Sequence, residues 1–264
     1  MNILTLLTDF GLQDGYVAIM KGVIWGIAPG AQIADISHAL AAQDILQGAL
    51  TLRRAAPYFP AGTVHVAVVD PGVGTSRRAL AGRLGEQYFV GPDNGLFSLV
   101  LEQAEARGQA VEWVHLTRPE YWLPQVSAVF HGRDVFAPVA AHLASGIPLN
   151  RLGEPIHDPL RLALPQPQRT VRGWSAQVLH IDRFGNLATN LRRDQVEPAQ
   201  AMDIHIKGKV IQGVVQAYGE GAPGELVALF DSSDFLSIAV VNGDAAQMFQ
   251  AKAGDPVEVA ISPA

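Results

Sequence analysis

The sequence predicts an α/β domain followed by a small all-β domain. Short apolar runs alternate with helical patterns through the first part of the chain, which is typical of a layered α/β fold. The Pro- and Gln-rich run LPQPQRT then interrupts this pattern, and short strand-like segments separated by Gly, Asp and Asn turns follow it. We therefore expect a Rossmann-like layered sheet in residues 1–163, a linker at 164–170 and a second domain at 171–264.

The elements of the first domain follow from apolar spacing. Runs rich in Val, Ile and Leu predict strands at Ile3–Leu7, Gln32–Ile36, Thr63–Val69, Tyr88–Val90 and Val111–His115. Helical spacing predicts helices at Tyr16–Ile27, Ile45–Ala55, Leu96–Glu105 and Val135–Ser145. Asp44, with Gln47 three residues on, predicts a helix N-cap in a capping box. Asp134 is a second expected N-cap, and Gly146 an expected helix end.

The second domain shows little helical periodicity. Its expected strands are Ser175–Ile181, Met202–Ile206, Val210–Val214, Leu226–Phe230, Leu236–Val240 and Val257–Ile261. Many short strands joined by turns predict a small antiparallel barrel or sandwich.

Composition narrows the class of protein. The 264 residues are 48% hydrophobic and 17% charged, which indicates a globular chain, and the net charge of −6 argues against nucleic-acid or anionic-membrane partners. The absence of cysteine excludes disulfides and thiolate catalysis and fits a cytoplasmic location. The start MNILTLLTDFG lacks the pattern of a signal peptide or membrane span. No ligand spacing such as H-E-x-x-H suggests a metal, so we expect none.

Acidic residues and turn motifs stand at the ends of the predicted strands, where α/β proteins place their sites. Asp9 follows the first strand, Asp70 the third, and PDNG the fourth, while FHGRD opens the last helix. Each motif alone would also suit an ordinary turn, because turns favour Asp, Asn and Gly. The stretch VDPGVGTSRR is less ordinary, because it leaves Asp70 at a strand end with Arg77 able to fold back towards it.

In combination the motifs resemble a known family. TDFG, DISH with QDI, VVDPGVGTSRR, GPDNGL, FHGRDVFAP and IDRFGNLATN, in this order from Leu4 to Ala246, resemble the S-adenosylmethionine hydroxide adenosyltransferases, relatives of the bacterial fluorinase and chlorinase. The resemblance implies an enzyme that hydrolyses S-adenosylmethionine, as substrate and without a cofactor, to adenosine and L-methionine. It also implies a C-terminal barrel and a homotrimer with sites between neighbouring subunits.

The resemblance assigns residues to this chemistry. Asp70, Arg77 and His131 would handle the attacking water. The substrate-binding positions that it implies are Asp9, Asp14, Gln43, Asp182, Phe184, Asn186, Ser233 and Val241. Asp9 and Gln43 would face the ribose, and Asp14 and Asp182 would hold the methionine ammonium. The residues implied around adenine are Phe184, Asn186, Ser233 and Val241.

Two other functions compete with hydrolysis. A halide-dependent adenosyltransferase is the first, but a carboxylate at position 70 would repel a halide, and the fluorinase has a tyrosine there. A non-catalytic sensor of adenosine or S-adenosylmethionine is the second. Such a sensor would keep Asp9 and Asn186. It would not need the trio, by which we mean Asp70, Arg77 and His131.

Overall fold

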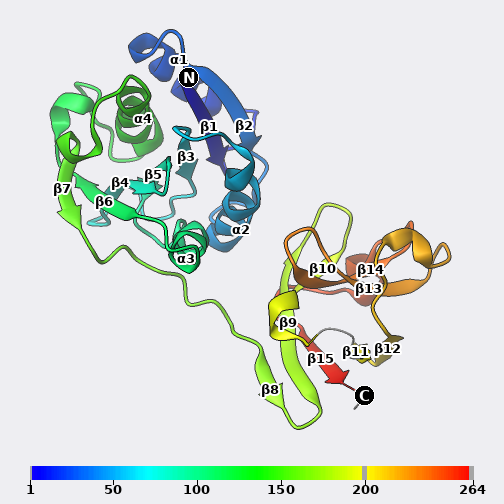
Figure 1. The fold of residues 1–264 in the computed structure, drawn as a ribbon. Helices are drawn as coiled ribbons and strands as arrows, with labels where there is room; N and C mark the ends of the chain where they lie inside the picture. Colours follow the sequence, from blue (N-terminus) through cyan, green and yellow to red (C-terminus); the bar gives the residue numbers. More distant parts are fainter. Residues whose placement is uncertain (1, 198–200, 262–264) are drawn as a thin grey trace. The chain divides into compact units, whose positions relative to one another are not determined.

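The computed structural model describes residues 2–197 and 201–261. The chain divides into two compact units, with the division between Leu162 and Ala163. The first is an α/β unit and the second is built from antiparallel strands (Figure 1), so the predicted fold class is confirmed. None of the helices in these residues is long and apolar enough to cross a membrane.

A seven-stranded mixed sheet forms the centre of the first unit, in the order β2-β1-β3-β5-β4-β6-β7. Its strands are β1 (Ile3–Thr8), β2 (Gln32–Ser37), β3 (Val64–Val68), β4 (Ala79–Leu84), β5 (Gln87–Pro92), β6 (Val111–Leu116) and β7 (Gly153–Ile156). The pairs β2-β1, β1-β3 and β3-β5 are parallel, whereas β4, β6 and β7 join by antiparallel pairing. Both Asp9 and Asp70 therefore follow the carboxyl ends of neighbouring parallel strands.

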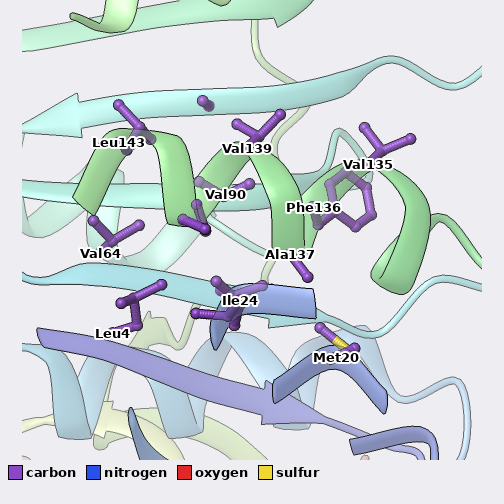
Figure 2. Close-up of a cluster of buried hydrophobic side chains, with 14 of the residues drawn as sticks. Leu4, Met20, Ile24, Val64, Val90, Val135, Phe136, Ala137, Val139 and Leu143 are labelled. Atoms are coloured by element: carbon purple, nitrogen blue, oxygen red, sulfur yellow. The ribbon is translucent and has the colours of Figure 1, made fainter. Parts of the chain in front are cut away.

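Four helices cover the two faces of this sheet: α1 (Tyr16–Ile27), α2 (Ile45–Ala55), α3 (Ser98–Ala106) and α4 (Ala137–Ala144). Helix α1 packs against α4, and α2 packs against α3 (Figure 1). Along β1, Leu4 and Leu6 enter one buried cluster and Leu7 the other, because successive strand residues point to opposite faces. Figure 2 shows the first cluster, in which strand residues such as Val64 and Val90 lie against α1 and α4.

Strands β4 and β7 were not expected from the sequence. The β4 segment ALAGRL contains no β-branched residue, so local preference gives little signal. Its Gly82 is required by packing, because a Cβ there would lie 2.2 Å from the Trp113 ring of the paired strand β6. The strand therefore depends on its neighbour rather than on its own composition.

The helix caps agree with the sequence only in part. Asp44 is the N-cap of α2, as predicted, and accepts a 2.8 Å hydrogen bond from Gln47 N. The side chain of Gln47 accepts from Ala41 N instead of closing a box on Asp44. Gly146 follows the end of α4 with φ 93°, the left-handed conformation expected of a helix-ending glycine.

The predicted N-cap at Asp134 is wrong. A π-helical turn at Gly132–Phe136 precedes α4, so Asp134 lies inside the helical segment instead of before it. Its fully buried carboxylate accepts hydrogen bonds from Arg133 Nε (2.5 Å) and from Ser127 N (2.8 Å). The aspartate thus ties down the loop before the helix, which carries Phe130 and His131.

The second unit contains β8 (Gln168–Thr170), β9 (Gly173–Ile181), β10 (Leu187–Arg192), β11 (Met202–Ile206), β12 (Lys209–Gln212), β13 (Leu226–Phe230), β14 (Phe235–Val240), β15 (Pro256–Ile261) and a short helix α5 (Ala245–Phe249). The main strand order is β12-β11-β15-β9-β10-β14-β13, with antiparallel pairing, and β8 pairs with β9. Because β12 and β13 also contact each other, the sheet curls into a nearly closed barrel. Strand β8 occupies part of the segment expected to be a linker.

The buried histidine His65 of β3 should make the protein sensitive to acid. Its side chain is fully buried, stacks on Phe89 and lies with Nδ1 2.8 Å from Thr5 Oγ1. Burial lowers the pKa of His65 to about 4. The unfolded chain takes up this proton near pH 6.5, so stability should fall as the pH drops from 6.5 towards 4, by up to about 3 kcal/mol from this group.

The variant His65→Asn tests this expectation, because it removes the titration and keeps a polar atom near Thr5. Urea unfolding at several pH values should show a flatter loss of stability between pH 6.5 and 4 than in the parent protein, with lower stability at pH 7. The exposed His157 supplies the control, and His157→Asn should leave the pH dependence unchanged. An equally steep loss in His65→Asn would show that His65 does not carry the effect.

Candidate active site

The loop between β3 and β4 brings Arg77 back to Asp70. Two tight turns, closed by Val73 N to Asp70 O (3.2 Å) and by Thr75 N to Gly72 O (3.2 Å), reverse the chain. Arg77 then donates from Nε to Asp70 Oδ1 (2.9 Å) and from Nη2 to Oδ2 (2.5 Å). The two side chains are only 9% and 5% exposed. This bidentate, largely dry ion pair confirms that the guanidinium folds back onto the carboxylate.

His131 joins the pair from a distant part of the sequence. Arg77 Nη2 also donates to His131 Nδ1 at 2.8 Å. The two loops approach closely at Gly74, where a Cβ would lie 2.3 Å from the carbonyl oxygen of Ala128. Gly74 also has φ 77°, so both its conformation and its lack of a side chain are needed there. The structure therefore brings Asp70, Arg77 and His131 together.

The hydrogen bond from Arg77 decides the tautomer of His131. A guanidinium has only donors, so His131 Nδ1 must accept, and the neutral ring carries its proton on Nε2. Burial lowers the pKa of His131 below its ordinary value of 6.5, the Arg77 charge lowers it further, and Asp70 and Asp134 oppose this. The imidazole is therefore neutral at pH 7 and offers an N–H donor at Nε2.

A cavity of about 610 Å³ lies in front of this group. Asp9, Gln43, Asp70 and His131 line it, whereas Arg77 does not. The backbone N–H of Gln43, which adopts φ 66°, donates to Asp9 Oδ2 at 2.8 Å and fixes that carboxylate. Four residues predicted from separate motifs thus share one cavity, with the guanidinium bound behind two of them.

Three aromatic rings on the wall of this cavity were not singled out from the sequence. Phe10, Tyr16 and Phe130 contact one another edge-on, with centroids 5.2–6.0 Å apart. Phe10 and Phe130 belong to the motifs TDFG and FHGRD, so the motifs themselves were the available signal. The rings provide an apolar surface close to the polar trio.

The second unit has a cavity of its own, of about 770 Å³, lined by Asp182, Phe184, Asn186 and Val241. Asp182 Oδ1 accepts from the backbone N–H groups of Phe184 (2.8 Å) and Asn186 (2.9 Å), and Oδ2 accepts from Asn186 Nδ2 (2.8 Å). The ring of Phe184 is 75% exposed. The motif IDRFGN therefore builds a rigid turn that presents an amide and an aromatic ring.

Tyr218 also lines this second cavity and was missed, since nothing in its local sequence marks it. Burial raises the pKa of its hydroxyl, and the charges of Asp182 and Asp231 raise it further. The hydroxyl therefore keeps its proton at neutral pH and is a hydrogen-bond donor beside the turn of Asp182.

Two predicted binding residues do not line either cavity. Asp14 is exposed just before α1. Ser233 lies in the turn between β13 and β14, where its N–H donates to Asp231 Oδ1 at 2.7 Å. Their roles stay predictions. Within residues 2–197 and 201–261, no group of three or more His, Asp or Glu side chains is placed to hold a metal ion.

Comparison with known families finds matches to both units of the chain. The N-terminal domain of the SAM hydroxide adenosyltransferases, where SAM is S-adenosylmethionine, matches residues 4–153. The C-terminal domain of the same family matches residues 176–258. The chain belongs to the SAM hydroxide adenosyltransferase family.

Relatives match over nearly their whole length. Proteins named (R)-S-adenosyl-L-methionine hydrolase from Thermus thermophilus and Salinispora tropica are 42% and 40% identical, covering 96% of this chain and 97% and 95% of their own. A fluorinase from an Actinoplanes species is 29% identical over 97% of both chains. The solved structure of an uncharacterized conserved protein from Thermotoga maritima, 38% identical, superposes with a TM-score of 0.87 over 97% of this chain and 99% of that one.

The contact between Arg77 and His131 makes a prediction that needs no assay of activity. In Arg77→Met the positive charge that lowers the pKa of His131 is lost and Asp70 remains, so this pKa should rise. NMR titration of the His131 ring protons measures it. Arg83→Met is the control, because Arg83 pairs with Glu112 away from the cavity. An unchanged His131 titration in Arg77→Met would contradict the contact.

Proposed function

We propose that the protein hydrolyses S-adenosylmethionine to adenosine and L-methionine. The observation that carries the proposal is that Asp70 and His131 line the first cavity while the guanidinium of Arg77 behind them holds both the carboxylate and the imidazole. The hydrolase relatives, which match the chain almost from end to end, support it.

The reaction needs no general acid, because its leaving group departs without a charge. Water attacks the ribose C5′, the C5′–S bond breaks, and its electron pair stays on sulfur, so methionine departs as a neutral thioether. The attacking water loses one proton as the C–O bond forms. The protein therefore has to position the water in line with the breaking bond and to accept that proton.

The tautomer of His131 supports a division of roles within the trio of Asp70, Arg77 and His131. Asp70 is the proposed proton acceptor, because a water that is already bonding to carbon is a strong acid and the carboxylate can take its proton. His131 offers its Nε2–H to the oxygen of the same water and orients it. Arg77 lies behind both groups and keeps carboxylate and ring at a fixed separation.

Binding would be shared between the two cavities. We assign the ribose hydroxyls to Asp9 and Gln43, and the adenine to Asn186, Phe184 and the backbone near Val241. The amide of Asn186 is held by Asp182, which fixes its direction. For Asp14, Asp182 and Ser233 we keep the family-implied roles at the methionine ammonium and near adenine. No cofactor is needed for this chemistry.

The substrate epimer follows from the relatives. Their names specify (R)-S-adenosyl-L-methionine, and because L already describes the amino-acid carbon, R describes the sulfonium. We propose that this protein also prefers the R sulfonium. We place it in the cytoplasm, where S-adenosylmethionine is made and used.

We further propose that the active form is a homotrimer, as in the family. Each site would combine the first cavity of one subunit with the second cavity of a neighbour. The residues of the two cavities belong to separate units of the chain, which supports a site that requires both.

Halide transfer is the less favoured reaction, because the Asp70 carboxylate lines the cavity where a halide would have to bind. A sensor without catalysis is also disfavoured, since adenosine recognition would not need a buried guanidinium between a carboxylate and a ring.

Hydrolysis should transfer solvent oxygen to carbon. Purified protein is incubated separately with the R and S epimers of S-adenosylmethionine in oxygen-18 water containing chloride, and the nucleoside is examined by mass spectrometry. We expect oxygen-18 on C5′ of adenosine, with faster turnover of the R epimer. Adenosine without the label would contradict attack by water. Formation of 5′-chloro-5′-deoxyadenosine would indicate halide transfer, and unchanged substrate would indicate the sensor.

Substitutions in the trio should lower the rate more than the affinity. Asp70→Asn and His131→Ala should each reduce the single-turnover rate by about 10²–10⁴, and Arg77→Ala combined with His131→Ala should cost much less than the product of the single losses. His131→Gln should retain more activity than His131→Ala, because its amide can replace the Nε2–H. Protonation of His131 at Nδ1 would break its contact with Arg77, so the parental rate should decline at acidic pH, below the lowered pKa of His131, and His131→Gln should lose this decline.

If His131→Gln and His131→Ala were equally inactive, the result would indicate that His131, instead of Asp70, accepts the proton of the water. Asp9→Ala is the contrasting variant, since it should weaken adenosine binding measured by calorimetry. A double variant with fully multiplicative losses would contradict action on one water.

Sites built from two subunits should show complementation. Asp70→Asn is defective in the first cavity and Asn186→Ala in the second, so each alone should be nearly inactive at low substrate concentration. Co-expressed as mixed oligomers they should regain up to about a quarter of the parental activity, because that share of sites combines two intact halves. No regain in isolated mixed oligomers would place the whole site within one chain.

A further inference from the structure

The loop that carries Asp70 and Arg77 is held at both ends by the turn after the neighbouring strand β5. This turn contains the motif PDNG, whose Asp93 and Asn94 do not line the cavity. The loop itself has no large apolar anchor, since its tip consists of Pro71, Gly72, Val73 and Gly74 and is half-buried or exposed. Its position therefore depends on how its ends are fixed.

Asn94 fixes the first end. Its side-chain Nδ2 donates to the carbonyl oxygen of Val69 at 2.8 Å, and its Oδ1 accepts from Leu96 N at 3.2 Å. Val69 is fully buried and directly precedes Asp70. The Asn94 side chain thus connects Val69, the residue before Asp70, to the backbone of Leu96 in the turn after β5.

Asp93 fixes the second end. Its N–H donates to Arg78 O at 2.9 Å, and its Oδ2 accepts from Arg78 Nε at 2.7 Å. Its Oδ1 accepts from Leu160 N at 2.7 Å, and the side chain is only 3% exposed. Arg78 also donates to Asp158, from Nη1 to the carboxylate at 2.8 Å.

The contacts of Asp93 and Asn94 with the two ends of the loop form a clamp. One hydrogen-bond acceptor, the carbonyl oxygen of Arg78, connects this clamp to the trio. The carbonyl oxygen of Arg78 accepts from Asp93 N and also from Arg77 Nη1, at 3.3 Å. The same guanidinium has to reach both oxygens of Asp70 and Nδ1 of His131, which leaves little freedom in its placement. A displacement of about 1 Å is enough to cost 10²-fold in rate in a positioned site.

We propose that Asp93 and Asn94 are positioning residues for the reaction, which act by holding the two ends of the loop and so set the separation of Asp70, Arg77 and His131. The inference rests on the proposed hydrolysis for its effect on rate. Its effect on the geometry of the trio is independent of any activity.

The variant Asn94→Leu tests the first end. Leucine has nearly the shape of asparagine and no charge, so it removes the bond to Val69 O without a new electrostatic effect. Gln87→Met is the matched control. Gln87 stands at the opposite end of β5 and donates to the carbonyl oxygens of Ala56 (2.9 Å) and Phe59 (2.8 Å), far along the strand from the loop.

Two measurements are made on both folded variants: NMR titration of His131, and kcat with KM for S-adenosylmethionine. The charged groups that act on His131 are Arg77, Asp70 and Asp134, and loosening Arg77 removes a charge that lowers the pKa. Asn94→Leu should therefore raise the pKa of His131 and lower kcat by about 10- to 100-fold with little change in KM. Gln87→Met should change neither.

A second variant, Asp93→Asn, tests the other end and covers the case in which Asn94→Leu does not fold. Removing a negative charge would by itself lower the pKa of His131, so a rise would report displacement of Arg77. If both measurements stay at the parental values in the folded variants, the positioning role is wrong. A shifted His131 titration in a protein that releases no adenosine would support the clamp and refute the proposed function.

Discussion

The guanidinium of Arg77 lies almost buried between Asp70 and His131 and donates to both. A buried charge is tolerated only when it is paired and hydrogen-bonded, so the carboxylate and the ring are as necessary to the arginine as the arginine is to them. Because Arg77 can only donate, it also fixes the tautomer of the neutral imidazole. This one side chain therefore orients both polar groups of the trio that line the first cavity.

The fold supplies the three groups from elements that are rigid for independent reasons. Asp70 follows a parallel strand in the middle of the sheet, at the edge where α/β proteins place their sites. His131 precedes a π-helical turn, and the buried carboxylate of Asp134 in that turn holds the preceding loop. Gly74 lets the two loops approach to within contact of backbone atoms.

The two cavities differ in character. The first contains two carboxylates, a neutral imidazole and three aromatic rings, which suits a displacement at carbon. The second contains a rigid turn with an aligned amide, an aromatic ring and a phenol, which suits recognition of a heterocycle. The two units, each with its own buried core, thus carry cavities of different chemistry.

The sequence by itself determined the fold class, most strands and helices, and the pairing of Asp70 with Arg77, because these depend on periodicity and on residues close in the chain. The family resemblance also predicted Asp9, Gln43 and His131 as site residues, and the structure places all three on the wall of one cavity. The sequence missed β4, whose Gly82 makes sense only beneath Trp113, and it misplaced the start of the last helix, because Asp134 pairs with Arg133 and Ser127 rather than capping. Only the tertiary structure decided the tautomer of His131 and the clamp by Asp93 and Asn94. Those features depend on hydrogen bonds between residues that lie 15, 25 and 54 positions apart in the chain, and no local sequence pattern contains their geometry.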